Sequence, residues 1–138
     1  MTNPIHPYCL FKTDVAMRRA KFLSPQCIEI LNDMAAYCED RKLPFIVTET
    51  VTTPEEDKAL SRVSSTHRTG RAFDISIRQW PEPAIYAFDK HFSGIFLHVA
   101  AIGGKTGEPE LIVRHDNGHG DHMHIQIAKV FAVDKPMG

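Results

Sequence analysis

The sequence has no long apolar run, no block of basic residues and no apolar leader. No stretch approaches the roughly 20 apolar residues of a transmembrane helix, so we expect no membrane insertion. Lysine and arginine are scattered and the formal net charge is -1, so no nucleic-acid-binding surface is indicated. Residues 1–8 lack the apolar core of a signal peptide, which predicts synthesis in the cytoplasm without a signal peptide.

Cysteine is scarce and unpaired by spacing. The three cysteines form no Cys-x-x-Cys motif, and their odd count favours free thiols in a reducing compartment. Cys27 and Cys38 are eleven residues apart, close to three helical turns, so we expect both on the buried face of one helix.

The length of 138 residues corresponds to one domain. We expect a core from about residue 22 to 130, with peripheral tails at 1–12 and 131–138, and a monomer in solution. A chain of this length can bury a hydrophobic core without support from disulfide bonds or other cross-links.

Apolar spacing and turn residues predict an α+β fold, with helices packed on a small antiparallel sheet. Ser24-Pro25 begins the longest helix and Leu43-Pro44 ends it, and Thr53-Pro54 begins a short one. The predicted helices are 24–43, 53–62 and 81–94. The predicted strands are 45–50, 72–77, 95–102, 111–113 and 122–128.

Two histidine-bearing stretches, 65–74 and 121–127, carry most of the chemical information. Gly70 permits a sharp turn that brings His67 and Asp74 toward one point. His124 lies on a predicted strand and shares a face with His122. Two imidazoles and a carboxylate are the three protein ligands of a catalytic zinc site, whose fourth position is left to water.

A spare carboxylate, Asp121, lies beside the last histidines, where a general base would be needed. Strand alternation directs the Asp121 side chain away from His124. Because Asp121 lies where the loop enters the strand, the loop could still turn its carboxylate toward the site. Asp116 and His119 form a second Asp-x-x-His pair within a glycine turn. They remain the alternative base and ligand.

The spacing of these residues resembles one enzyme family. The motif S-x-H-x-x-G-x-A-x-D matches residues 65–74, D-x-x-H and H-x-H match 121–124, and residues 47–56 resemble the family's strand and T-P-E-E helix start. This pattern is similar to zinc D-alanyl-D-alanine carboxypeptidases and phage L-alanyl-D-glutamate endopeptidases. That family shares its fold with lysostaphin-type peptidases and the hedgehog signalling domain, and the resemblance covers about residues 45–127.

The resemblance implies a Zn²⁺ ion and a role for each matching residue. The implied metal ligands are His67, Asp74 and His124, and the implied catalytic residues are Asp121 as general base and His122 as a transition-state donor. Ser65, Arg68 and Arg71 are the candidate substrate-binding residues.

One position departs from the family pattern. The family usually has an arginine directly before the T-P pair, and here that position is Thr52. Threonine lacks the several charged N–H donors of arginine. Either Arg62, Arg68, Arg71 or His122 takes over the role of the arginine, or the chain is a weaker or differently selective enzyme.

The resemblance therefore predicts a zinc peptidase that cuts the peptide stems of bacterial peptidoglycan. It would be a phage endolysin released through a holin to act on the cell wall, or a bacterial enzyme. The bond cut would be L-Ala–D-Glu or D-Ala–D-Ala. Two other hypotheses stay open: a zinc-stabilised binding module without catalysis, and a globular domain whose histidines bind no physiological metal.

Overall fold

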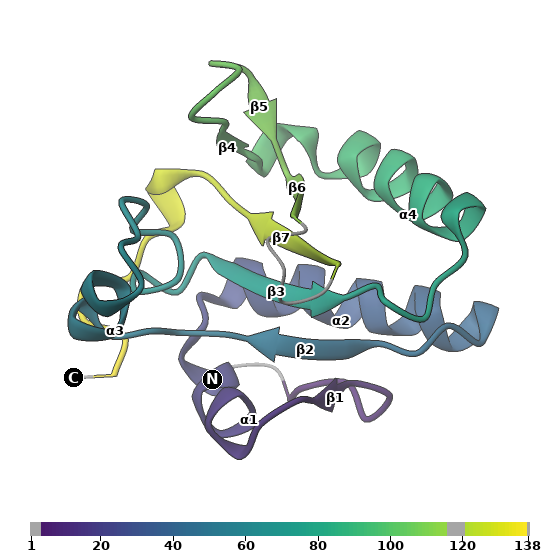
Figure 1. Ribbon diagram of the computed structural model, residues 1–138, viewed down its shortest axis with the longest axis horizontal. Coiled ribbons are helices and arrows are strands. Elements are labelled where there is room, and N and C mark those ends of the chain that lie inside the picture. The colour runs from purple at the N-terminus through teal and green to yellow at the C-terminus, as the bar shows by residue number, and fades with distance from the viewer. Residues whose placement is uncertain (1–3, 116–120, 138) are drawn as a thin grey trace.

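A five-stranded mixed sheet forms the centre of the protein in the computed structural model, which describes residues 4–115 and 121–137. Its strand order is β1-β2-β3-β7-β6 (Figure 1). The bounds are β1 (Leu10–Phe11), β2 (Ile46–Glu49), β3 (Ala72–Ser76), β6 (Ile112–His115) and β7 (His122–Gln126). A separate two-stranded sheet pairs β4 (Ala101–Ile102) with β5 (Pro109–Glu110). The predicted α+β class is confirmed.

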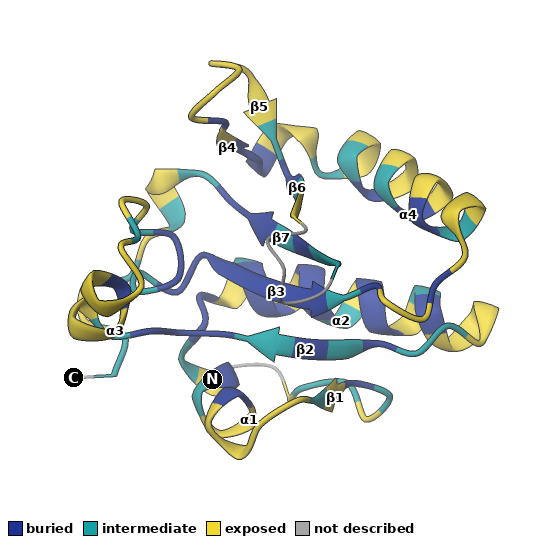
Figure 2. Cartoon of the chain, in the orientation of Figure 1, coloured by how far each residue is buried: buried dark blue, intermediate teal, exposed yellow. Residues whose placement is uncertain are grey.

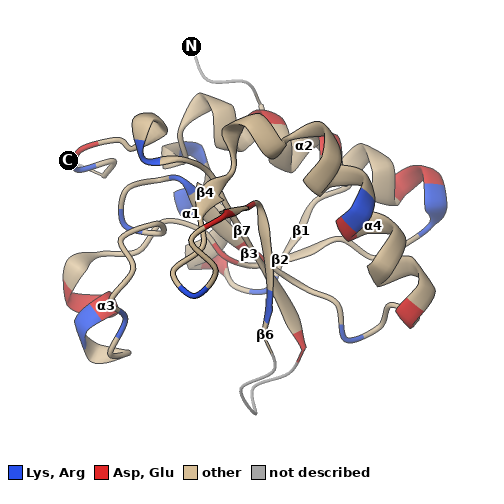
Figure 3. Cartoon of the chain, turned by 90° about the horizontal axis from the view of Figure 1, so that it is seen from above, with Lys and Arg blue, Asp and Glu red and all other residues tan. Residues whose placement is uncertain are grey.

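Within residues 4–115 and 121–137, four α-helices surround this sheet: α1 (Asp14–Arg19), α2 (Pro25–Arg41), α3 (Pro54–Ala59) and α4 (Glu82–Ile95). Short 3₁₀ turns follow at Ala20–Phe22, Leu97–Val99 and Lys129–Phe131. In the described part of the chain, no helix is long and apolar enough to cross a membrane. Acidic and basic residues both occur along the helices (Figure 3).

Helix α2 is the main support of the sheet. Ser24 Oγ accepts a hydrogen bond from Cys27 N at 3.2 Å and Pro25 occupies the first turn, as the sequence predicts. The helix ends where Lys42 adopts a left-handed conformation. Its buried side, which includes Cys27 and Cys38, packs against the sheet in the view of Figure 2. The predicted placement of these two cysteines on one buried face is confirmed.

Three local predictions differ from the structure. Residues 95–102 are not one strand, because α4 continues to Ile95, a 3₁₀ turn follows, and only Ala101–Ile102 is extended. Burial there follows no alternation, since Ile95 and Leu97 are both exposed while Val99, Ala100 and Ala101 are all buried. The sheet is also not purely antiparallel, because β1 pairs in parallel with β2. The two-residue length of β1 and the six-residue length of α1 left no periodicity to detect.

The two faces of the sheet differ in chemistry. Phe73 and Ile75 of β3 point into the apolar core, together with Met123 and Ile125 of β7. Asp74 and His124 lie opposite one another in the β3–β7 register and therefore share the other face. The strand pairing thus gathers the polar side chains of the predicted site on the side away from the core.

Gly70 shapes the loop that precedes β3. Its φ of 70° lies in the left-handed region, and its carbonyl accepts a hydrogen bond from Ser24 N at 2.7 Å. A Cβ at this position would lie 3.0 Å from the Phe22 carbonyl oxygen. The backbone therefore requires glycine here for both conformation and space.

We predict that Gly70→Ala lowers the free energy of unfolding by about 1–3 kcal/mol, because alanine must adopt a strained φ against a fixed carbonyl. Urea denaturation measures the change. Gly94→Ala is the matched control: it lies in α4 with open space around it, and should leave stability unchanged or raise it by up to ~1 kcal/mol. Equal effects at both positions would contradict this account.

Candidate metal centre

His67, Asp74 and His124 converge on a single point. His67 Nε2 lies 3.2 Å and His124 Nδ1 2.9 Å from the same carboxylate oxygen, Asp74 Oδ1. The candidate ligand atoms of the three residues all lie within 4.8 Å of one another. Among the residues that the structure describes, they are the one group of three or more such side chains with this geometry. The three residues could hold a metal ion, as the sequence predicts.

Each of these side chains is positioned by a different element. Asp74 lies in the middle of β3, between β2 and β7, and is 7 % exposed. His124 is its direct partner on β7. His67 comes from the turn before β3, which is closed by hydrogen bonds from Gly70 N to the His67 carbonyl and from Arg71 N to the Thr66 carbonyl.

The outer ring nitrogen of His67, Nδ1, which points away from Asp74, has a defined partner. His67 Nδ1 donates to the Thr50 carbonyl at 2.7 Å, because a carbonyl oxygen can only accept. In the neutral imidazole, Nε2 then carries the lone pair that faces Asp74. Such an outer contact fixes the tautomer and the ring orientation of a metal-binding histidine.

His124 is oriented by the same principle through a side chain. Gln126 Nε2 donates to the Glu110 carbonyl at 2.9 Å, which directs Gln126 Oε1 toward the histidine. His124 Nε2 lies 3.1 Å from that oxygen and donates to it. The lone pair of neutral His124 therefore sits on Nδ1, which points at Asp74.

A cation is needed to balance this arrangement. Two imidazole lone pairs facing one buried carboxylate oxygen would repel it unless protons or a metal ion lie between them. Burial alone would lower the pKa of His67, but the charge and hydrogen bond of Asp74 outweigh burial and raise this pKa. Burial alone would raise the pKa of Asp74, but the nearby imidazoles hold it well below its usual range. Metal binding would displace the histidine protons.

Zinc is one metal that suits this donor set, and two of the three ligand separations match its geometry. Tetrahedral zinc with bonds of about 2.0–2.1 Å places its ligand atoms about 3.3 Å apart. The two separations from Asp74 Oδ1, 2.9 and 3.2 Å, are close to this value. Two imidazoles and one carboxylate are a usual donor set of catalytic zinc.

Asp121, the predicted base, is not part of this convergence. Its carboxylate accepts two hydrogen bonds from Arg114, and Arg114 also pairs with Glu82 at the start of α4. The Arg114 hydrogen bonds and charge lower the pKa of Asp121. The side chain of Asp121 is 25 % exposed and takes the direction that strand alternation gives it, rather than turning back toward His124.

The remaining histidines of this face belong to β6 and β7. His122 pairs in register with His115, and their ring centroids are 5.4 Å apart. His122 shares the face of His124, as predicted. Burial and the neighbouring imidazoles lower the pKa of His115. Asp116 and His119, the alternative base and ligand, lie outside the described residues.

The predicted substrate-binding residues make contacts within the protein. Arg71 donates to Ser65 Oγ, Thr69 Oγ1 and the Ile127 carbonyl, which joins the His67 loop to the end of β7. Arg68 pairs with Asp57 at 3.2 Å. The structure thus places Arg71 in contact with Ser65, and Arg68 in contact with Asp57 of α3.

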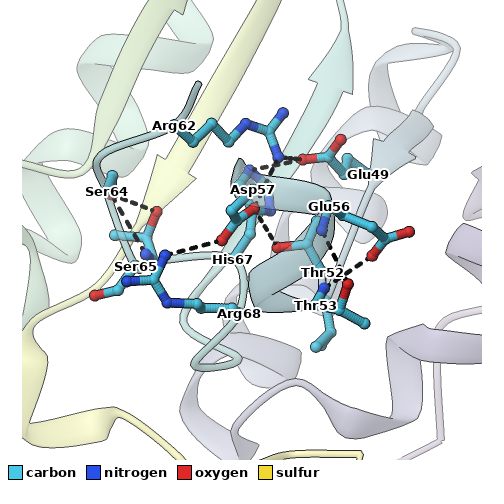
Figure 4. A network of polar contacts seen from close by, with 12 residues as sticks. Glu49, Thr52, Thr53, Glu56, Asp57, Arg62, Ser64, Ser65, His67 and Arg68 are labelled. Carbon is cyan, nitrogen blue, oxygen red and sulfur yellow. Dashed lines mark hydrogen bonds and ion pairs between the residues drawn. The ribbon is translucent and has the colours of Figure 1, made fainter. Parts of the chain in front are cut away.

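Sequence reasoning assigned no role to two side chains beside His67 and His124, those of Glu49 and Gln126. Glu49 Oε1 lies 3.4 Å from His67 Nε2, and Glu49 forms an ion pair with Arg62 (Figure 4). Gln126 could have been recognised, because it is two residues from His124 on the same strand face. Glu49 could not, because its position depends on a register shift between Val47 and Glu49 in the β2–β3 pairing.

Comparisons with known protein families, curated proteins and solved structures found no match for this chain. The family resemblance therefore rests on the motif residues, and the structure supports the candidate metal site within them.

We predict that His67→Ala, Asp74→Ala and His124→Ala each lower the metal content of the purified protein well below one ion per chain, because each removes one of three ligands. Plasma mass spectrometry measures the content. His115→Ala is the near control, since its ring lies 6.3 Å from that of His124, and it should keep the metal. Loss of metal in His115→Ala, with full retention in His67→Ala, would refute this ligand set.

Proposed function

We propose that this protein is a zinc-dependent peptidase that hydrolyses the peptide stems of bacterial peptidoglycan. The observation that carries the proposal is the His67–Asp74–His124 group, in which both imidazoles have their outer nitrogens fixed and their inner nitrogens directed at one point. Three protein ligands leave a fourth position for water or substrate, as in catalytic rather than structural zinc sites.

The substrate class comes from the sequence pattern. The two motifs around the triad resemble those of peptidases that cut L-Ala–D-Glu or D-Ala–D-Ala bonds, and the metal ligands occupy the matching positions. We infer that one of these bonds is the target. We propose the cell wall as its site of action, which it would reach as an endolysin released through a holin.

Hydrolysis requires a polarised carbonyl, an activated water and a base. A bound zinc ion supplies the first two, since it acts as a Lewis acid and lowers the pKa of water. We assign the base role to Asp121, which the Arg114 hydrogen bonds keep ionised at neutral pH. Its carboxylate would rotate away from the two Arg114 hydrogen bonds, accept a proton from the attacking water and pass it to the leaving amine.

Glu49 is the competing base. It is the carboxylate nearest His67 after Asp74, but its Oε1 oxygen is also paired with Arg62. This contact suits Glu49 to positioning Arg62 rather than to proton transfer.

A binding module that retains zinc without catalysis is the second candidate function. The observation that favours it is the fork between Asp121 and Arg114, which leaves the resting site without its expected base.

The test is hydrolysis of purified peptidoglycan by the zinc-loaded protein, followed by mass spectrometry of the products. We expect cleavage that a chelator abolishes and added zinc restores. Released D-alanine would identify a carboxypeptidase, and a new amino terminus on D-glutamate an endopeptidase. Zinc-loaded protein that binds peptidoglycan without cutting it would establish the binding module instead.

Asp121→Asn and Glu49→Gln, each of which replaces a carboxylate by its amide, distinguish the two bases. We expect Asp121→Asn to keep its zinc and lose about 10²- to 10⁴-fold in turnover, with a smaller loss in Glu49→Gln. Full turnover in Asp121→Asn, together with loss of the acidic limb of the pH–rate profile in Glu49→Gln, would transfer the role to Glu49.

A further inference from the structure

An arginine lies on the β2 side of the candidate metal centre. Arg62 follows α3, and its guanidinium meets the Glu49 carboxylate beside the His67 ring (Figure 4). The Arg62 side chain is 28 % exposed. The Arg62 side chain therefore lies close to His67 and is also partly exposed to the solvent from which a substrate would enter.

A buried carboxylate anchors this arginine. The Asp57 side chain is 1 % exposed and accepts hydrogen bonds from Thr52 Oγ1 at 2.7 Å and from Arg68 at 3.2 Å. Arg62 Nη1 lies 3.5 Å from it, and Arg62 N donates to the Asp57 carbonyl at 2.8 Å. A buried charge must be paired to be tolerated, so Asp57 keeps both guanidinium groups close to α3.

The contact between Arg62 and Glu49 has charge but poor direction. Both Glu49 Oε1 and Arg62 Nη1 are buried, and neither has a well-aligned hydrogen-bond partner among the described residues. Buried polar atoms are normally satisfied. The guanidinium carries five N–H donors, so an oxygen atom arriving at the metal centre could bind Arg62 while Nη1 stays paired with Glu49.

The charge balance of the site also favours an anionic oxygen. The carboxylates of Asp74, Glu49 and Asp57 exceed the guanidiniums of Arg62 and Arg68 by one negative charge. A divalent cation on the triad turns this excess into one positive charge. A substrate carboxylate, or a carbonyl that gains charge during hydrolysis, would be attracted there.

We propose that Arg62 binds this substrate oxygen, and that Glu49 and Asp57 are its positioning residues. The inference deepens the proposed function and rests on it. Thr52 stands where the resembled family usually has an arginine, and here it donates to the Asp57 carboxylate that holds Arg62.

The experiment uses cobalt(II)-loaded protein, acetate as the probe and the visible cobalt spectrum as the readout of binding. Arg62→Gln should retain its metal, because Arg62 is not a ligand, and should raise the dissociation constant of acetate about 10-fold or more, the effect of losing one charge-assisted hydrogen bond. Arg62→Lys should give an intermediate increase, since lysine keeps the charge and loses the fork.

Arg19→Gln is the matched control. Arg19 also tethers α3, through Glu56 and the Val51 carbonyl, but within the described part of the chain it forms no hydrogen bond or ion pair with Glu49 or Asp57. It should bind acetate like the wild type. If Arg62→Gln folds poorly, Arg62→Lys decides the question.

Metal-loaded Arg62 variants that bind acetate as tightly as the wild type would overturn the inference, even where peptidoglycan is hydrolysed. If acetate binding depends on Arg62 but the wild type cuts no peptidoglycan, the anion site stands and the peptidase proposal fails.

Discussion

The buried carboxylate of Asp74, shared between two imidazoles, is the interaction on which the candidate site depends. Its oxygen lies 3.2 Å from His67 and 2.9 Å from His124, in the middle of a sheet whose other face is apolar. A negative charge at this depth is stable only with a cation beside it. A divalent metal ion would satisfy this requirement, because it takes up the lone pairs that the two rings direct inward.

The rest of the fold serves this geometry through separate contacts. The β3–β7 register aligns Asp74 with His124, and the turn at Gly70 returns the chain so that His67 meets them. The Thr50 carbonyl and the Gln126 side chain orient the two rings from outside. These contacts come from three places: the residue that follows β2, the loop that precedes β3, and strand β7. The ligand geometry therefore depends on the whole sheet rather than on one motif.

Local patterns predicted the parts that depend on local rules. The cap at Ser24, the helix face of Cys27 and Cys38, and the strand alternation around Asp74 and His124 all follow from spacing, and the choice of His67, Asp74 and His124 followed from the motif resemblance. The contacts that surround the triad are different in kind. The approach of Glu49 and Arg62 requires a shifted register and a carboxylate, Asp57, buried by tertiary packing. The ion pair of Asp121 depends on an arginine from the neighbouring strand. Neither can be obtained from one segment alone.

X-ray absorption spectroscopy at the zinc edge of the purified protein tests the central claim most directly. The account predicts nitrogen and oxygen scatterers at about 2.0–2.1 Å, with the multiple scattering of two imidazole rings and no sulfur. A zinc–sulfur shell at about 2.3 Å would place the metal on the cysteines. That result, or the absence of imidazole scattering, would contradict a metal centre built on His67, Asp74 and His124.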